Sequence, residues 1–209
     1  MRTSTHTTGA HRARINFACY RMILDTMELY HFNPRYCITV EFIPQRGINK
    51  HIDSHIKHFH NVSCSFINSN RWYDDTPGIV YIKEKHRSDQ YHLHIVMEEI
   101  PTVLLQRIVG KSFLVCSKSE PVAPDQFSQL ELAFIQKYTE HLRRHVRVIG
   151  GGKDSIDFAA VYEIKGLVNY VNKSIFLTQE VTIDHVDLEY SSIFNQTWRN
   201  NRIQMLNNR

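Results

Sequence analysis

Two histidines separated by one leucine are the first feature of this 209-residue chain that could do chemistry. His92 and His94 lie in the run Tyr-His-Leu-His-Ile-Val-Met at residues 91–97. The alternation of polar and apolar types predicts a β-strand, in which residues two apart point to the same face. The two imidazoles would then lie about 6–7 Å apart along the strand, a spacing that one divalent cation can bridge.

A metal ion held by two imidazoles commonly takes a carboxylate as its third ligand, and Glu84 is the candidate. The polar run 86–90 has the length of a hairpin turn, so a strand over 79–85 would pair antiparallel with the histidine strand. Glu84 would then lie directly opposite His92, on the same face, with Cβ atoms about 4.5–5.5 Å apart. A shift of one residue in this register would turn Glu84 to the other face.

A second motif, Tyr-x-x-Lys, is formed by Tyr170 and Lys173 in a helix expected over 164–174. Residues three apart are neighbours on a helix surface. A tyrosine hydroxyl has a pKa near 10 and is a poor nucleophile, unless its target is a phosphate whose developing charge a metal stabilises. A lysine one turn away could hold the phosphate or the departing oxygen. The motif recurs at Tyr162 and Lys165, where Tyr162 is expected to be buried at a strand end and is the alternative nucleophile.

The elements that must position these residues mix strands with helices. Strands are predicted over 35–43, 79–85, 91–98 and 155–163, and helices over 15–29, 48–68, 102–109, 125–145 and 164–174. The central hairpin indicates an α+β fold with helices packed on an antiparallel sheet. Residues 1–14 are expected to form a flexible basic arm, 99–154 a mostly helical insertion, and 181–209 a peripheral C-terminal tail.

Composition places the chain among globular proteins, with 42% hydrophobic and 22% charged residues. The net charge of +4 is compatible with a nucleic-acid partner without requiring one. The four cysteines form no Cys-x-x-Cys pair, which argues against a zinc ribbon or a disulfide framework and favours a cytoplasmic location. No apolar run approaches the ~20 residues of a membrane span, so no membrane association is expected.

The order of the motifs resembles the HUH endonucleases, and in particular the single-tyrosine initiators of rolling-circle replication in plasmids and single-stranded DNA viruses. The resemblance covers roughly residues 35–176, within an expected nuclease domain of residues 15–180. It implies a ferredoxin-like or RRM-like antiparallel sheet that acts on a single-stranded origin hairpin, with the host replication machinery as a further partner. The long stretch 99–154 departs from the compact viral members.

The resemblance also assigns roles to the residues of the two motifs. It implies that Glu84, His92 and His94 bind Mn²⁺ or Mg²⁺. It further implies that Tyr170 attacks the DNA to form a 5′-phosphotyrosine, and that Lys173 accompanies it.

Several of the same residue types have ordinary structural interpretations. A second His-x-His, His58 to His60, is expected in a helix, where residues two apart do not share a face. His51, His55 and His58 recur at helical spacing and are interpreted as a solvated helix face. Glu98 lies further along the histidine face and is the alternative metal ligand.

Three other functions stay open at this point. A single-tyrosine transposase or relaxase would share the chemistry and differ in the DNA it cuts. A non-catalytic DNA-binding module would use the same sheet without a metal. A metal-dependent hydrolase with a water nucleophile would leave no covalent protein–DNA adduct.

Overall fold

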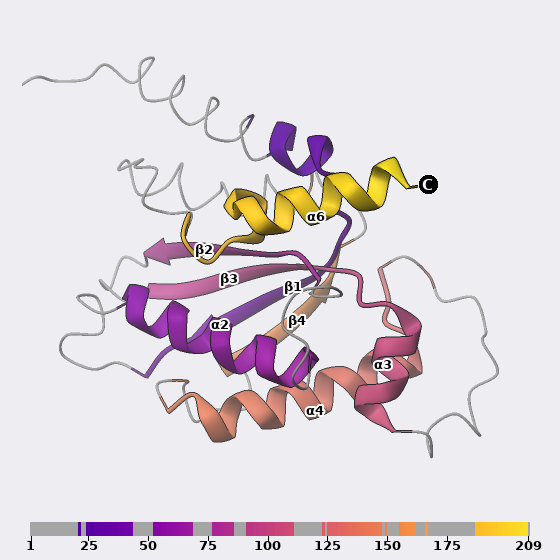
Figure 1. Ribbon diagram of the computed structural model, residues 1–209. Helices are drawn as coiled ribbons and strands as arrows, with labels where there is room; N and C mark the ends of the chain where they lie inside the picture. The colour runs from indigo at the N-terminus through magenta and orange to yellow at the C-terminus, as the bar shows by residue number, and fades with distance from the viewer. Residues whose placement is uncertain are drawn as a thin grey trace, which may run out of the picture.

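The computed structural model describes residues 21, 24–43, 52–68, 77–85, 91–110, 123, 125–147, 149, 155–161, 166 and 187–208. Its strands are β1 (Pro34–Glu41), β2 (Ile79–Lys85), β3 (Tyr91–Glu98) and β4 (Ile156–Ala160). Its helices are α2 (Ile52–Asn68), α3 (Thr102–Val109), α4 (Gln129–His145), the 3-10 turn η5 (Ser192–Phe194) and α6 (Gln196–Asn207), and residues 24–29 are also helical. The strands form one antiparallel sheet in the order β2-β3-β1-β4 (Figure 1), which confirms the predicted α+β class.

The bounds of β2, β3 and α3 are those that the sequence predicts. Helix α4 begins later than predicted, because Ser128 and Glu131 form a capping box. The Glu131 amide donates to Ser128 Oγ at 3.2 Å, and the Ser128 amide donates to a Glu131 carboxylate oxygen at 2.8 Å. These two bonds satisfy amide groups that the first turn of a helix leaves unpaired, so the helix starts there.

Other expected segments lie outside the described residues. These are the basic arm over 1–14, the hairpin turn over 86–90 and most of the helix over 164–174, of which only the helical residue 166 is described.

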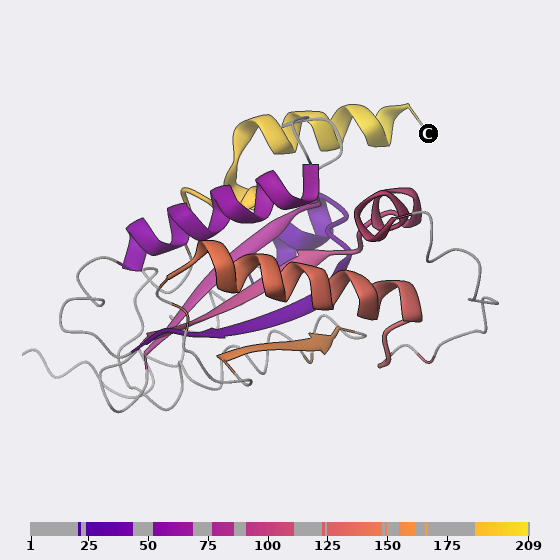
Figure 2. The same cartoon turned by 90° about the horizontal axis from the view of Figure 1, so that it is seen from below.

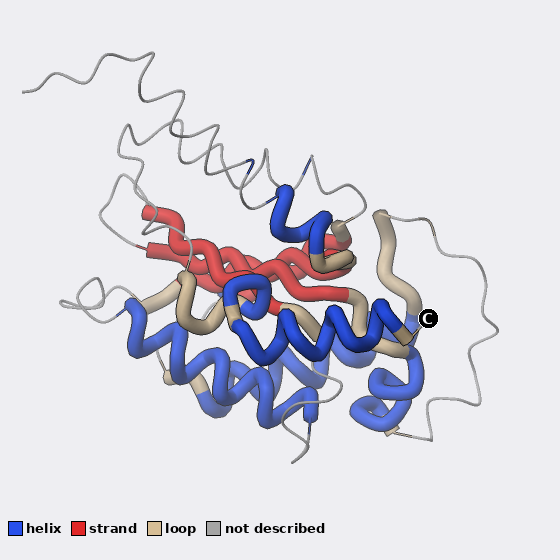
Figure 3. The backbone as a smooth tube through the Cα atoms, turned by 45° about the horizontal axis from the view of Figure 1, so that its top comes forward, coloured by secondary structure: helices blue, strands red, loops and turns tan. Residues whose placement is uncertain are grey.

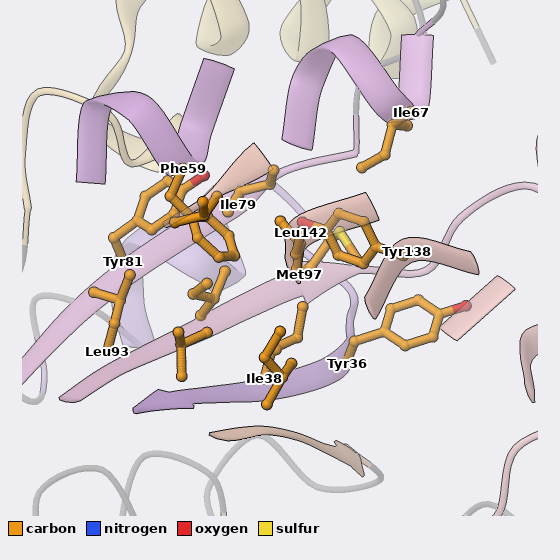
Figure 4. Packing of buried hydrophobic residues seen from close by; sticks show 14 of the residues in the cluster. Tyr36, Ile38, Phe59, Ile67, Ile79, Tyr81, Leu93, Met97, Tyr138 and Leu142 are labelled. Atoms are coloured by element: carbon orange, nitrogen blue, oxygen red, sulfur yellow. The ribbon is translucent and has the colours of Figure 1, made fainter. Parts of the chain in front are cut away.

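One face of the sheet carries the main core and is covered by α2 and α4, which lie side by side (Figure 2). Leu93, Ile95 and Met97 point to this face and are buried, as the alternation along the histidine strand predicts. They pack with aromatic and aliphatic side chains from both helices and from the neighbouring strands (Figure 4); among these are Tyr36, Ile38, Phe59, Ile67, Tyr81, Tyr138 and Leu142. Because this face is apolar along β1 and β3, the register of these two strands is strongly specified.

The opposite face of the sheet carries a smaller core. Val80, Ile82 and Val96 pack there against Met27 and Phe32, from the helical segment 24–29 and the residues that follow it. Ile193 of η5 is also fully buried in this cluster. Helices therefore lie on both sides of the sheet (Figure 3).

The sequence predicts a peripheral tail over residues 181–209, but the described part of this segment, residues 187–208, packs along the outer edge of β2. The Tyr81 amide donates to Ser191 Oγ and the Ile79 amide to Ser192 Oγ, both at 2.9 Å. An edge strand presents unpaired amides on its open side, and the two hydroxyls satisfy them. The segment that ends in α6 is therefore a part of the folded domain.

Candidate metal centre

The β2–β3 hairpin places Glu84 directly opposite His92, in the register expected from the sequence. His94 lies two residues further along β3 and so points to the same face. This face of β2 is otherwise apolar, with Val80 and Ile82 buried against the smaller core. The alternation along both strands therefore holds the polar side chains together at one end of the hairpin.

The three side chains converge on one carboxylate oxygen. Oε2 of Glu84 lies 2.8 Å from His92 Nε2 and 2.5 Å from His94 Nε2. The centroids of the two imidazole rings are 4.9 Å apart, and the ring planes meet at 79°. Both histidines are buried, whereas the Glu84 side chain is 23% exposed, so solvent can reach the cluster from the side of Glu84.

The electrostatics of the cluster favour an ionised carboxylate. Burial raises the pKa of the Glu84 carboxyl, but the hydrogen bonds and charges of His92 and His94 outweigh it and bring the pKa well below its usual range. Glu84 is therefore negatively charged at neutral pH. It faces two imidazole nitrogens, each of which could bind a metal ion when it carries no proton.

Thr39 of the central strand β1 supports the ring of His94. The two residues are opposite each other in the β1–β3 pairing, and Thr39 Oγ1 lies 3.2 Å from His94 Nδ1. A partner on one ring nitrogen fixes the orientation of the ring, which leaves Nε2 to face the cluster. The sequence does not indicate this role of Thr39, because β1 and β3 are joined by no short turn that would reveal their register.

The donor set fits a divalent cation. One ligand atom from each of Glu84, His92 and His94 lies within 4.8 Å of the others, so the group could bind a metal ion. Two imidazoles and one carboxylate also form the protein ligand set of several catalytic metal sites, which keep further positions open for water or substrate. It is the one such convergent group among the residues that the structure describes.

Of the remaining candidate site residues, only Glu98 is among the residues that the structure describes. Tyr170, Lys173 and Tyr162 lie outside the described residues. Glu98, the alternative ligand, lies at the far end of β3, where its carboxylate accepts hydrogen bonds from the amides of Gly78 at 2.6 Å and Asn33 at 3.1 Å. Glu98 is thus a structural residue and does not take the place of Glu84.

The second His-x-His pair diverges, as expected for a helix. His58 Nε2 lies 2.8 Å from the backbone oxygen of His145 in α4. His60 Nδ1 lies 3.1 Å from the hydroxyl of Tyr81. The two rings therefore have separate structural partners.

The fold and the cluster together define an α+β protein with an antiparallel sheet and a candidate metal centre on one hairpin. Within the described ranges, no helix has the length and apolar character needed to cross a membrane. Comparisons with protein-family models, with curated proteins and with solved structures found no match to this chain.

Proposed function

We propose that this protein is a metal-dependent nuclease that nicks single-stranded origin DNA through Tyr170 and so initiates rolling-circle replication. The observation that carries the proposal is the convergence of Glu84, His92 and His94 on one face of the hairpin. The resemblance of the motif order to HUH endonucleases supplies the nucleophile, since the Tyr-x-x-Lys motif follows the histidine strand in the chain.

Each of the named residues has a distinct role in the proposed reaction. A Mn²⁺ or Mg²⁺ ion bound by Glu84, His92 and His94 would supply positive charge that polarises the scissile phosphate. The Tyr170 oxygen attacks phosphorus, so that the bond from tyrosine to phosphorus forms as the bond to the 3′ oxygen breaks. The phenolic proton is lost and the 3′ oxygen gains one, while the charge of Lys173 offsets that of the phosphate.

The products are a 5′-phosphotyrosine and a free 3′-OH, which host replication enzymes can extend. Attack by a 3′-OH on the phosphotyrosine reverses the reaction, because the energy of the phosphodiester is conserved in the covalent link. The same protein can therefore rejoin the strand at the end of a cycle.

The direct test is to trap the covalent intermediate. The protein is incubated with Mn²⁺ and single-stranded DNA from the genetic element that encodes it, and the products are separated on a denaturing gel. We expect a protein–DNA adduct that mass spectrometry assigns to the peptide containing Tyr170. Tyr170→Phe should abolish the adduct, and the matched variant Tyr162→Phe should retain it.

Other results of the adduct assay would support the alternative functions that the sequence leaves open. Cleavage without an adduct would identify a hydrolase with a water nucleophile, and binding without cleavage would identify a DNA-binding module. An adduct on Tyr162 would overturn the choice of nucleophile. An adduct formed on transposon ends or on a transfer origin, but not on a replication origin, would identify a transposase or relaxase.

The role of the metal is tested separately with the same substrate. EDTA should abolish adduct formation, and a series of Mn²⁺, Mg²⁺ and Zn²⁺ would show which ion restores it. Full activity in EDTA would overturn the assignment of a metal to this site.

A further inference from the structure

The C-terminal end of α4 carries a cluster of arginines that the proposed chemistry does not use. Arg143, Arg144 and Arg147 are all exposed, and we refer to them as the α4 basic end. Residues 141–153 contain no aspartate or glutamate, and Glu140, directly before them, is the acidic partner of Arg144.

The α4 basic end lies at the same end of the sheet as the candidate metal centre, although α4 covers the opposite face. Arg147 is followed by Ile149, which forms a β-bridge with Phe42. Phe42 comes directly after Glu41, and Glu41 pairs with His92 across β1 and β3. In Figure 1 the C-terminal end of α4 is on the same side of the molecule as the end of β2 that carries Glu84.

Helix capping does not account for Arg144 or Arg147. His58 already contacts the backbone oxygen of His145, and the amide of Val146 donates to the Leu142 oxygen at 2.8 Å, so carbonyl groups of the last turn have other partners. Arg147 lies beyond the end of the helix. Arg144 lies 3.5 Å from Glu140 in an exposed pair, which competes only weakly with an incoming anion.

We infer that the α4 basic end binds the phosphate backbone of single-stranded DNA on its way to or from the metal centre. This inference rests on the proposed function. Guanidinium groups present planar, forked donors that match phosphate oxygens, and three of them close together create a local positive field. Single-stranded DNA fits better than an acidic protein, because the cations lie at the same end of the sheet as a centre whose proposed substrate is a phosphodiester, and a strand that passes around this end reaches both.

The test uses the number of counterions released on binding. Binding of a fluorescently labelled 15-nucleotide oligo-dT is measured by anisotropy in EDTA over a series of salt concentrations. Each phosphate contact contributes about 0.7 to the slope of log K against log salt for a single strand. Arg144→Ala and Arg147→Ala should each lower the slope by about 0.7, whereas Arg147→Lys should preserve it.

The matched control is Arg107→Ala, which removes an exposed arginine from α3 at the opposite end of the sheet. It should leave the slope unchanged. An equal fall in the slope for Arg107→Ala, or unchanged slopes for the two α4 variants, would overturn the inference. A lowered slope on duplex DNA but not on oligo-dT would overturn the assignment to single strands.

The binding test and the adduct test can fail independently. Because binding is measured in EDTA, it needs neither the metal nor Tyr170. Lowered slopes without any adduct would support the α4 basic end and overturn the nuclease. An adduct together with unchanged slopes would support the nuclease and overturn the α4 basic end.

Discussion

Glu84 and His94 come from the two strands of one hairpin, and their closest atoms, Oε2 and Nε2, are 2.5 Å apart. The ring of His94 is also engaged at its other nitrogen by Thr39 of a third strand. The orientation of this ligand is therefore fixed by the fold, and an ion would find it already in place.

His94→Ala should remove metal binding, because it deletes one of three convergent ligands. We expect isothermal titration calorimetry with Mn²⁺ to show no binding to this variant, and the adduct assay to show no nicking. The matched control is His58→Ala, which removes an exposed histidine whose ring contacts the backbone oxygen of His145 at the end of α4. Equal loss in both variants, or normal binding by His94→Ala, would contradict the assignment.

Thr39→Val should weaken the metal site without removing a ligand. The substitution keeps the shape of a half-buried side chain but deletes the hydroxyl that lies 3.2 Å from His94 Nδ1. Loss of such a supporting partner typically costs about 10–100-fold in metal affinity. Calorimetry would measure the affinity, and Thr39→Ser should restore it. A Thr39→Val protein that binds as tightly as the wild type would show that Thr39 plays no part in positioning the ring.

Glu131→Gln should destabilise the fold most at neutral pH. The Glu131 carboxylate accepts two hydrogen bonds from the guanidinium of Arg35, at 2.7 and 3.1 Å, and both side chains are largely buried. Burial raises the pKa of Glu131, but the bonds from Arg35 and Ser128 outweigh it, so the net pKa is lowered. The stabilisation that comes from this lowered pKa is fully present above the pKa of the Glu131 carboxyl in the unfolded state, about 4.3. It is lost as the pH falls through the pKa of the same carboxyl in the folded state.

The difference in unfolding free energy between wild type and Glu131→Gln should therefore be about 1.5–3 kcal/mol at pH 7 and should shrink as the pH is lowered below about 4. Denaturant unfolding at both pH values measures it, and glutamine keeps the capping box. Glu140→Gln is the control, since its exposed pair with Arg144 should contribute less than about 1 kcal/mol. A difference that stays constant with pH would contradict the charge-based account.

Arg202→Ala should destabilise the whole domain, although it lies in the last helix. The guanidinium of Arg202 pairs with the buried carboxylate of Glu98 and packs 4.8 Å from the ring centre of Trp198. Removing one partner of a buried pair leaves the other charge uncompensated, at a cost of about 3 kcal/mol. Denaturant unfolding would measure the loss, with the exposed neighbour Gln204→Ala as control. A change below about 0.5 kcal/mol would mean that α6 adds little to the fold.

The hairpin is the part of the site that the sequence predicts well. A five-residue turn and two alternating strands are local features, and a slip of β2 by one residue would turn Glu84 away from His92 and bring Lys83 to the face of the histidines. The pairing of Glu84 with His92 could therefore be derived without the rest of the molecule.

The contacts that the sequence does not predict join residues that are far apart in the chain. Thr39 meets His94 at a distance of 55 residues along the chain, and Ser191 meets Tyr81 at 110. A single serine or threonine is not part of a periodic hydrophobic pattern, so the sequence does not indicate that it makes such a contact. Helix α6 likewise contains no fully buried residue, so its sequence gives little sign that it belongs to the domain. The capping box at Ser128 and Glu131 is a local signature, and it could have located the start of α4.

All three candidate ligands fall within residues 84–94, a span of ten peptide bonds. An ion at this site would close only a short loop, and the entropy that such closure removes from the unfolded chain grows with loop length. It would therefore join no distant segments, unlike the ion of a small domain that unfolds when its zinc is removed. The sheet and its cores should persist through repeated loss and recovery of the ion, so that demetallation and denaturation are separate events for this protein.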